Sequence, residues 1–296
     1  MATNDLEYGY EPFADTPEYR QVNETIVQRW VNAMREAGSV QLDRIVDLAT
    51  GVGTMVQLLI EKLPRAAKPK DVVCVDMSDR ALEQAGANLA GSVDRVTPIH
   101  SPVQDLALEP ESVDMAMWGN GVHYLTGDEQ RRTFERIREA LRPGGWFLFN
   151  SAFVAESRPA ETLAFYRGQI ATAVRSLRER GVKREKSTPA AESAMFLPLS
   201  HYRQLLEQSG FRVEEVREVV ARLYQSAWEK ISGFSQYAAG ALHGYPLDDA
   251  AEALVAAVKP ALEQYGFVDE NGERYVPRHW YFAIARKELG ALRSGE

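Results

Sequence analysis

A short segment that joins a carboxylate to two glycines is the first place where this sequence could do chemistry. Residues 45–48 (Ile-Val-Asp-Leu) are typical of a buried strand, and Gly51 and Gly53 follow before an apolar helical pattern begins at Met55. Glycine reaches positive φ at little cost and lets a ligand lie against the backbone. The free N–H groups at the start of the following helix can bind a negative group. The segment therefore predicts a nucleotide-type ligand at a strand-to-helix turn.

The flanking residues narrow the class of ligand. A dinucleotide-binding turn has a third glycine three residues after the second, where this chain has Val56. The carboxylate of Asp47, four residues before Gly51, suits a ligand with a cationic amino acid end better than one with a diphosphate. No Gly-Lys-Ser/Thr sequence follows, which excludes a phosphate-cradling NTPase loop.

A second carboxylate ends the next predicted strand, residues 72–76. Asp76 comes 23 residues after Gly53, the spacing at which an acid binds ribose hydroxyls in doubly wound nucleotide folds. The alternative role is an N-cap for the following helix, but Ser78 and Asp79 are available for that cap. We therefore expect Asp76 to bind a ribose.

These segments resemble one enzyme family. Residues 47–54 (Asp-Leu-Ala-Thr-Gly-Val-Gly-Thr) are similar to motif I of the class I S-adenosylmethionine-dependent methyltransferases, commonly Asp/Glu-x-Gly-x-Gly-x-Gly, with Ala49 in place of the first glycine. Residues 113–125 and the Leu-Arg-Pro-Gly-Gly turn before the aromatic strand 146–150 also resemble that family. The resemblance implies an α/β fold with a doubly wound, seven-stranded, mostly parallel sheet, a helical cap, and S-adenosylmethionine as cofactor.

The resemblance also implies a set of site residues. Met77 is expected to pack on the adenine, and Val103, Gln104 or Asp105 to meet its edge, although Asp105 is equally consistent with a surface turn. The implied cofactor-binding residues are Asp47, Ala49, Gly51, Gly53, Asp76, Met77, Val103, Gln104, Asp105 and Asn120.

Catalytic candidates follow the fourth predicted strand. In the family the loop there passes the methyl group, so His123 and Tyr124 are expected to face the acceptor, and neutral His123 is suited to accept a proton. The alternative for His123 is a structural or wall residue. Further candidates for the acceptor site are Tyr8, Tyr19, His243 and Tyr245. The five histidines lack metal-ligand spacing, so no metal is expected.

Composition limits partners and location. The net charge of −8 over 296 residues argues against nonspecific binding of nucleic acid. The single cysteine, Cys74, excludes a disulfide within the chain and fits a reducing cytoplasm. No apolar run of 18 residues and no apolar signal core appear. We expect a cytoplasmic protein without a membrane partner, monomeric or homodimeric, that acts on a small molecule.

The chain divides into six predicted segments. The helical additions are expected to form the cap over the carboxyl ends of the strands; the alternatives are an extension of the core or a dimer interface. The segments are 1–39 (N-terminal helical lid), 40–152 (cofactor-binding core), 153–198 (helical cap insertion), 199–222 (core helix and strand six), 223–277 (second cap insertion) and 278–296 (final strand and tail).

The favoured function is methyl transfer from S-adenosylmethionine to a small-molecule acceptor, mainly by positioning the reactants. Two alternatives keep the cofactor. One is cyclisation or alkyl transfer that releases methylthioadenosine, and the other is a non-catalytic binding protein. A nicotinamide dehydrogenase is disfavoured by Asp47 and Val56.

Overall fold

The computed structural model describes residues 10–38, 41–185 and 196–288. The chain forms two compact units. The sheet unit comprises residues 23–152, 197–219 and 281–296, and the helical unit comprises residues 1–22, 153–196 and 220–280.

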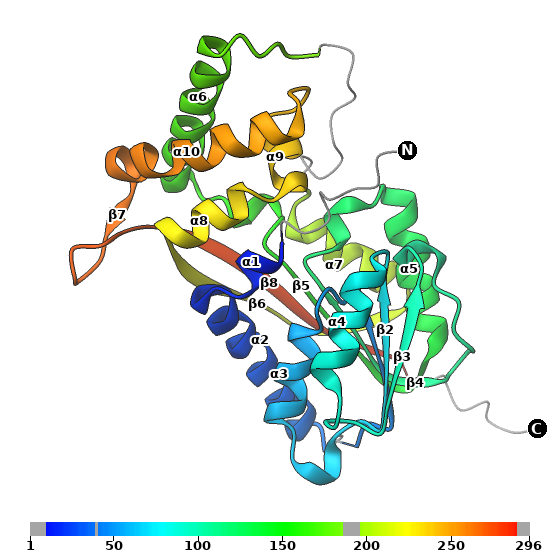
Figure 1. Ribbon diagram of the computed structural model, residues 1–296. Coiled ribbons are helices and arrows are strands. Elements are labelled where there is room, and N and C mark those ends of the chain that lie inside the picture. Colours follow the sequence, from blue (N-terminus) through cyan, green and yellow to red (C-terminus); the bar gives the residue numbers. More distant parts are fainter. Residues whose placement is uncertain (1–9, 39–40, 186–195, 289–296) are drawn as a thin grey trace, which may run out of the picture. The chain divides into compact units, whose positions relative to one another are not determined.

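The sheet has the predicted doubly wound order, β3-β2-β1-β4-β5-β8-β6 (Figure 1). Strands β1 to β5 pair in parallel, and β8 pairs antiparallel to β5. All seven predicted strands are present, and an eighth of two residues, β7, pairs with β8. The strands are β1 Arg44–Leu48, β2 Asp71–Asp76, β3 Arg95–His100, β4 Val113–Gly119, β5 Leu141–Ser151, β6 Phe211–Tyr224, β7 Phe267–Val268 and β8 Arg274–Lys287.

The chain order reverses between β1 and β4. From β1 the chain proceeds through α3 (Thr54–Lys62) to β2 and through α4 (Asp79–Leu89) to β3, and then returns to β4 on the other side of β1. Helix α5 (Gly127–Ala140) then leads to β5, and α7 (Leu199–Gln208) packs against α5. Because parallel crossovers are right-handed, α3 and α4 cover one face and α5 the other. Ligands of such sheets bind at the carboxyl ends of the strands next to this reversal.

Strand β5 starts earlier than the sequence predicts. The Leu-Arg-Pro-Gly-Gly segment was expected to be a turn before a strand at residues 146–150. Leu141 instead pairs with Val113, and the register shifts before Trp146 pairs with Met115. The β5 strand therefore contains the glycines within an irregularity, and Gly144 there has a φ of 76°.

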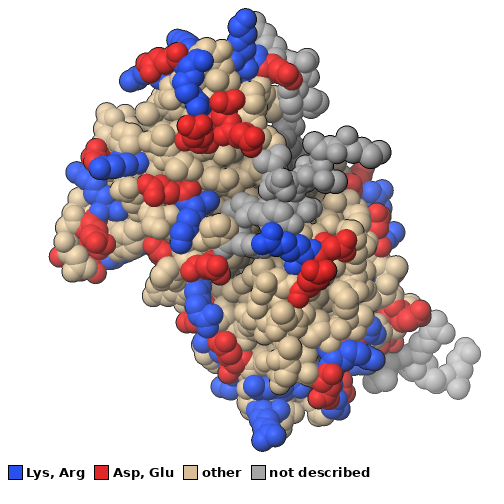
Figure 2. All heavy atoms as spheres, in the orientation of Figure 1, with Lys and Arg blue, Asp and Glu red and all other residues tan. Residues whose placement is uncertain are grey.

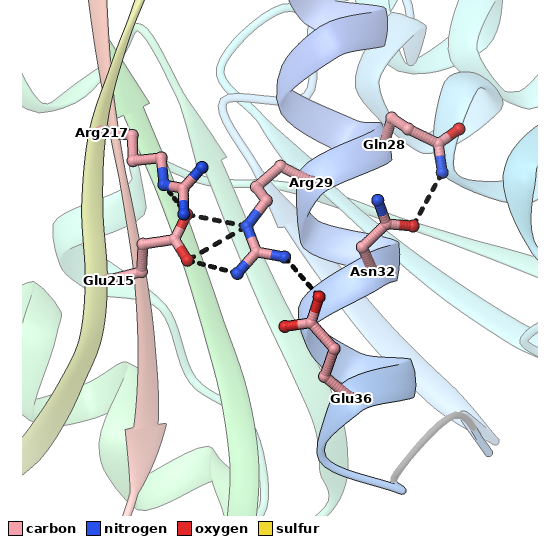
Figure 3. Close-up of polar contacts among 6 residues, drawn as sticks. All are labelled: Gln28, Arg29, Asn32, Glu36, Glu215 and Arg217. Atoms are coloured by element: carbon pink, nitrogen blue, oxygen red, sulfur yellow. Dashed lines mark hydrogen bonds and ion pairs between the residues drawn. The ribbon is translucent and has the colours of Figure 1, made fainter.

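Helix α2 (Pro17–Glu36) is fixed to strand β6 by an ion-pair network (Figure 3). The Nε of Arg29 donates to both carboxylate oxygens of Glu215, at 2.9 and 3.0 Å. Arg217 contacts the same carboxylate at 2.7 Å, and Glu36 accepts from Arg29 at 2.8 Å. The bond from Arg29 is the main cause that lowers the pKa of Glu215. The helix is thereby anchored within the sheet unit through a half-buried pair of charges.

The helical unit is built around α6 and α10, which lie side by side (Figure 1). Small residues such as Ala173, Ala253 and Ala257 are buried between them and allow close approach. The predicted second cap insertion, residues 223–277, contains two short helices that are separated at Gly233 and Phe234. The helices are α1 Glu11–Ala14, α6 Leu163–Glu179, α8 Gln225–Ser232, α9 Ser235–Ala241 and α10 Leu247–Tyr265.

On the molecular face in Figure 2, basic and acidic side chains are interspersed rather than gathered by sign. Among the described helices, none is both long enough and apolar enough to cross a bilayer.

Candidate functional site

The carboxyl ends of five parallel strands bring the predicted cofactor residues together. In the register of the sheet, Asp47 on β1 lies opposite Cys74 on β2, and Asp76 lies opposite His100 on β3. On the other side of β1, Gly119 at the end of β4 lies opposite Asn150 on β5. The sheet therefore places the first and second predicted carboxylates on neighbouring strands at its ligand-binding edge.

The turn after β1 depends on three residues with left-handed backbone. Ala49, Gly51 and Gly53 have φ angles of 51°, 52° and 83°. This conformation explains why glycine is suited to the position of Ala49, where the Cβ adds a cost of about 1–2 kcal/mol. A Cβ on Gly51 would meet nothing within 4 Å, whereas one on Gly53 would lie 3.4 Å from Ala85 on α4. Gly53 thus serves close helix packing, and Gly51 leaves its open side to a ligand.

Asp76 connects the end of β2 to the glycine turn. Its Oδ2 accepts a hydrogen bond from the Gly51 N–H at 2.9 Å, and its Oδ1 accepts one from the Ser78 N–H at 3.0 Å. The N-cap of α4 is Ser78, whose hydroxyl accepts from Ala81 N–H. Asp76 is therefore not the helix cap, and each of its carboxylate oxygens keeps acceptor capacity for a ligand.

Asp47 is a buried carboxyl group. Its residue is 2% exposed, and its Oδ2 accepts a hydrogen bond from the Thr50 hydroxyl. Burial raises its pKa to about 7; the bond from Thr50 opposes this, and the charge of Asp76 adds to it. Among the described residues, no cation forms an ion pair with Asp47. Buried carboxylates are normally paired, so this one is suited to receive a ligand cation.

The residues expected around an adenine lie at the ends of β2 and β3. Met77 is 64% exposed, which is unusual for so large an apolar side chain. Val103, Gln104 and Asp105 form a single turn of 3₁₀ helix in which Val103 is buried and Asp105 is exposed. His100, for which sequence reasoning gave no role, contacts the Met77 carbonyl at 2.7 Å through its Nε2.

Asn120 joins the ends of β4 and β5. Its φ is 49°, its N–H donates to the Asn150 carbonyl at 2.9 Å, and its Oδ1 accepts from the Ala152 N–H at 2.9 Å. Its buried Nδ2 has no hydrogen-bond partner within the described part of the chain. Asn120 therefore has a structural role and retains one donor for a ligand.

His123 and Tyr124 form a short 3₁₀ turn after β4, Val122–Tyr124. His123 is 2% exposed and Tyr124 is 37% exposed, with their ring centroids 3.9 Å apart. The Gln130 side chain holds this turn by donating to the carbonyls of Val122 and Leu125, at 3.2 and 3.0 Å. The Oε1 of Gln130 lies 3.3 Å from His201 Nε2. The structure thus places the imidazole in a supported, buried turn.

Sequence reasoning missed Asn150. It is fully buried at the end of β5, and neither its Oδ1 nor its Nδ2 has a partner among the described residues. A Cβ on Gly119 would lie 3.5 Å from its Nδ2. The signal was an amide ending the apolar run Trp-Phe-Leu-Phe. A buried amide without partners is costly, so this residue joins the candidate site.

The predicted acceptor residues lie in different surroundings within the helical unit. Tyr19 is 5% exposed, and its ring packs against Tyr10 and Phe13. His243 contacts the Arg184 guanidinium through both its carbonyl and its Nδ1, and Tyr245 packs at the edge of the α6–α10 core. Tyr8 lies outside the described residues. Their role toward an acceptor remains a prediction.

Metal and thiol chemistry have little support in the described residues. No group of three or more His, Cys, Asp or Glu side chains among them is placed to hold a metal. Cys74 is fully buried on β2, and burial raises its pKa to about 12. A thiol in this setting is a poor nucleophile.

Comparison with known proteins agrees with this geometry. A family model described as a methyltransferase domain matches residues 45–145. The ubiquinone/menaquinone biosynthesis C-methyltransferase UbiE of Syntrophotalea carbinolica is 27% identical over 218 residues, which cover 69% of this chain and 88% of that protein.

Two solved structures share the fold. A Bacillus halodurans protein superposes with a TM-score of 0.53 at 15% identity, covering 87% of this chain and 98% of the other. The N-methyltransferase NodS of Bradyrhizobium japonicum, solved with S-adenosyl-L-homocysteine, has a TM-score of 0.50 at 12% identity, covering 96% and 93%.

Proposed function

We propose that the chain is a class I S-adenosylmethionine-dependent methyltransferase that transfers a methyl group to a small-molecule acceptor, supported by the methyltransferase-domain match and by the similarity to a C-methyltransferase. The observation that carries the assignment of the cofactor site is the meeting of Asp47, Gly51 and Asp76 at the reversal point of the sheet. S-adenosylmethionine, when bound, supplies an electrophilic methyl group on a sulfonium.

The residues at this edge fit the cofactor in charge and in shape. Asp47, a buried carboxyl without a cationic partner among the described residues, is suited to the amino group of the cofactor. Asp76 has free acceptor capacity for two ribose hydroxyls, and exposed Met77 offers an apolar surface to the adenine. The open side of Gly51 allows close approach to the backbone. We assign Val103, Gln104 and Asp105 to the adenine edge on their position alone.

The remaining site residues position the reaction. Methyl transfer is an in-line displacement, so orientation of the acceptor supplies much of the rate. Asn120 retains a buried donor and Asn150 both of its amide groups, so these side chains can fix polar atoms near the transferred group. For an acceptor that must lose a proton, His123 is the proposed base, with its turn supported by Gln130.

The acceptor side of the proposal rests on charge, cysteine content and the helical unit. The net charge of −8 argues against a polyanionic substrate, and the single buried cysteine fits a cytoplasmic setting. We propose that the helical unit contributes residues that bind the acceptor, as the predicted cap segments imply.

The test has two parts. Calorimetry should show binding of S-adenosylmethionine and S-adenosylhomocysteine to the full-length protein, and absence of binding would end the proposal. Incubation of labelled cofactor with a small-molecule extract, followed by mass spectrometry, should yield a methylated product and S-adenosylhomocysteine. Methylthioadenosine as the only cofactor product would instead favour alkyl transfer or cyclisation.

A further inference from the structure

Two arginines of the helical unit share one set of aromatic rings. The Cζ of Arg158 lies 5.6 Å from the ring centroid of Tyr166, and the Cζ of Arg278 lies 5.8 Å from the same centroid. Both guanidinium groups also lie over Phe196, at 3.4 and 5.9 Å. We call Arg158, Arg278, Phe153, Tyr166, Phe196 and Tyr237 the arginine–aromatic cluster. Like charges brought this close repel each other.

The cluster is partly shielded from water. Arg278 is 4% exposed and Tyr166 is 6% exposed, whereas the other four members are half-buried. Burial, with the neighbouring charge of Arg278, lowers the pKa of Arg158. Burial also raises the pKa of the Tyr237 hydroxyl, which the two arginines partly oppose. The Arg278 guanidinium is therefore buried and the Arg158 guanidinium is partly desolvated, and an opposite charge has more effect there than in bulk water.

The charge of Arg158 is unbalanced within the described part of the chain. Among the described residues, no carboxylate forms an ion pair with its guanidinium, which lies over the rings of Tyr166 and Phe196. Ring contacts offset part of the desolvation but bind no N–H donor. A guanidinium at stacking distance from Phe196 keeps its in-plane donors at the edge of the stack, where a planar carboxylate can accept two parallel hydrogen bonds.

Arg278, the second arginine of the cluster, has a defined orientation. Its Nη1 donates to the Tyr166 hydroxyl at 2.8 Å, and its Cζ lies 5.3 Å from the ring centroid of Phe153. Phe153 in turn packs against Phe196, with centroids 5.9 Å apart. The surroundings of the two cations are therefore aromatic, which suits an anion that carries an apolar or aromatic body.

We propose that the arginine–aromatic cluster binds the carboxylate of an organic acid whose apolar body lies on its rings, and that this acid is the methyl acceptor. The identification as acceptor rests on the proposed function. The binding of an organic carboxylate does not rest on the proposed function, because it is argued from the residues of the helical unit alone.

The binding test uses benzoate as probe on the full-length protein, with benzamide as its neutral counterpart and inorganic phosphate as a bare anion. Ligand-observed NMR should detect benzoate binding. Arg158→Gln should weaken it at least tenfold, and Arg158→Lys should weaken it less. Arg175→Gln, at an exposed arginine on the same helical unit, should change it less than twofold. Benzamide bound as tightly as benzoate, or unchanged affinity in Arg158→Gln, would overturn the site.

Inorganic phosphate tests whether the cluster prefers an organic anion to a bare one. Benzoate should bind at least tenfold more tightly than phosphate, and equal competition would overturn the assignment to an organic acid.

For the acceptor, a small-molecule extract is divided on an anion-exchange resin and each fraction is incubated with labelled S-adenosylmethionine. Methylation should be at least tenfold greater in the retained fraction, and label found mainly in the flow-through would overturn this part.

These outcomes keep the two proposals apart. Failure of benzoate to bind, with methyl transfer intact, counts against the cluster and leaves the proposed function standing. Bound benzoate without cofactor binding or methyl transfer counts against the proposed function and leaves the carboxylate site standing.

Discussion

The backbone N–H of Gly51 donates a 2.9 Å hydrogen bond to the carboxylate of Asp76, 25 residues further along the chain. This bond joins the turn after β1 to the end of β2, the two elements expected to hold opposite parts of one ligand. Asp76 is thus oriented by the turn before a ribose arrives, and the carboxylate pays less ordering entropy on binding.

Replacement of Asp76 by alanine is predicted to weaken the binding of S-adenosylmethionine by about 1.5–3 kcal/mol, roughly 10- to 150-fold, because hydrogen bonds to a charged acceptor are lost. Calorimetry on both proteins measures the change. Glu83→Ala, which removes an exposed carboxylate on α4, is the matched control and should bind within twofold of the wild type. Unchanged affinity in Asp76→Ala would remove the residue from the site.

The pKa of about 7 at Asp47 predicts a pH-dependent affinity for the cofactor. Pairing with the cationic amino group requires the carboxylate, so a proton must leave Asp47 before binding at low pH. Affinity should fall roughly 25-fold from pH 7.5 to pH 5.5. Asp47→Asn should bind weakly with little pH dependence. A flat wild-type profile over this range would contradict the pairing.

The same group predicts how stability without ligand depends on pH. The pKa of Asp47 is raised from 3.8 to about 7 on folding, so the folded state binds this proton more tightly than the unfolded state. The contribution of this bound proton to the free energy of unfolding is complete below pH 3.8 and is lost as the pH rises through 7. Asp47→Asn does not titrate, so its stability relative to the wild type should rise by about 1.4 kcal/mol per pH unit between pH 5 and 7. Melting temperatures of both proteins across this range provide the test.

Replacement of His123 by alanine distinguishes a base from a wall residue. If the acceptor must lose a proton, turnover should fall by roughly 10²–10⁴ with cofactor affinity nearly unchanged. The wild-type rate should rise with pH, and that rise should be absent in the variant. Arg132→Ala, at an exposed residue of α5, is the control. Identical pH–rate profiles in His123→Ala and the wild type would show that His123 is not a base and only lines the site.

Gly121 is predicted to be required for the turn that carries His123. A Cβ there would lie 2.4 Å from the Trp118 indole nitrogen and 3.2 Å from the Ala49 Cβ. Gly121→Ala should therefore destabilise the protein by about 1–3 kcal/mol through overpacking. The control is Gly86→Ala within α4, where a Cβ meets nothing within 4 Å and helix propensity should add about 0.5–1 kcal/mol. Equal melting temperatures for the two variants would show that the turn tolerates the methyl group.

The strands that carry the predicted cofactor residues could be predicted from the sequence because their signals are local. The strand around Asp47 and the acid ending the next strand follow from apolar runs and fixed spacing, and the structure brings them together. Asn150 was missed because its lack of hydrogen-bond partners becomes visible only when β5 lies beside β4. Arg158 and Arg278 were missed for the same reason, since 120 positions separate two residues that share one tyrosine ring.

Within the predicted cap insertion at residues 223–277, the boundary between two helices could not be read from the sequence. The apolar periodicity continues through Gly233 and Phe234. It therefore does not predict that α8 ends and α9 begins there. The end of α8 is decided by its backbone at Gly233, whose N–H still bonds the Glu229 carbonyl, while Phe234 adopts an extended conformation.

The burial of Cys74 has a practical use in spectroscopy. It is the chain's single cysteine, it has no exposed surface, and its pKa is raised to about 12, so thiol reagents at neutral pH will not reach it in the folded protein. A cysteine introduced at any exposed position can therefore be labelled selectively without first removing a native one. Position 77, where the methionine is 64% exposed beside Asp76, would place a fluorophore at the edge where the adenine is expected.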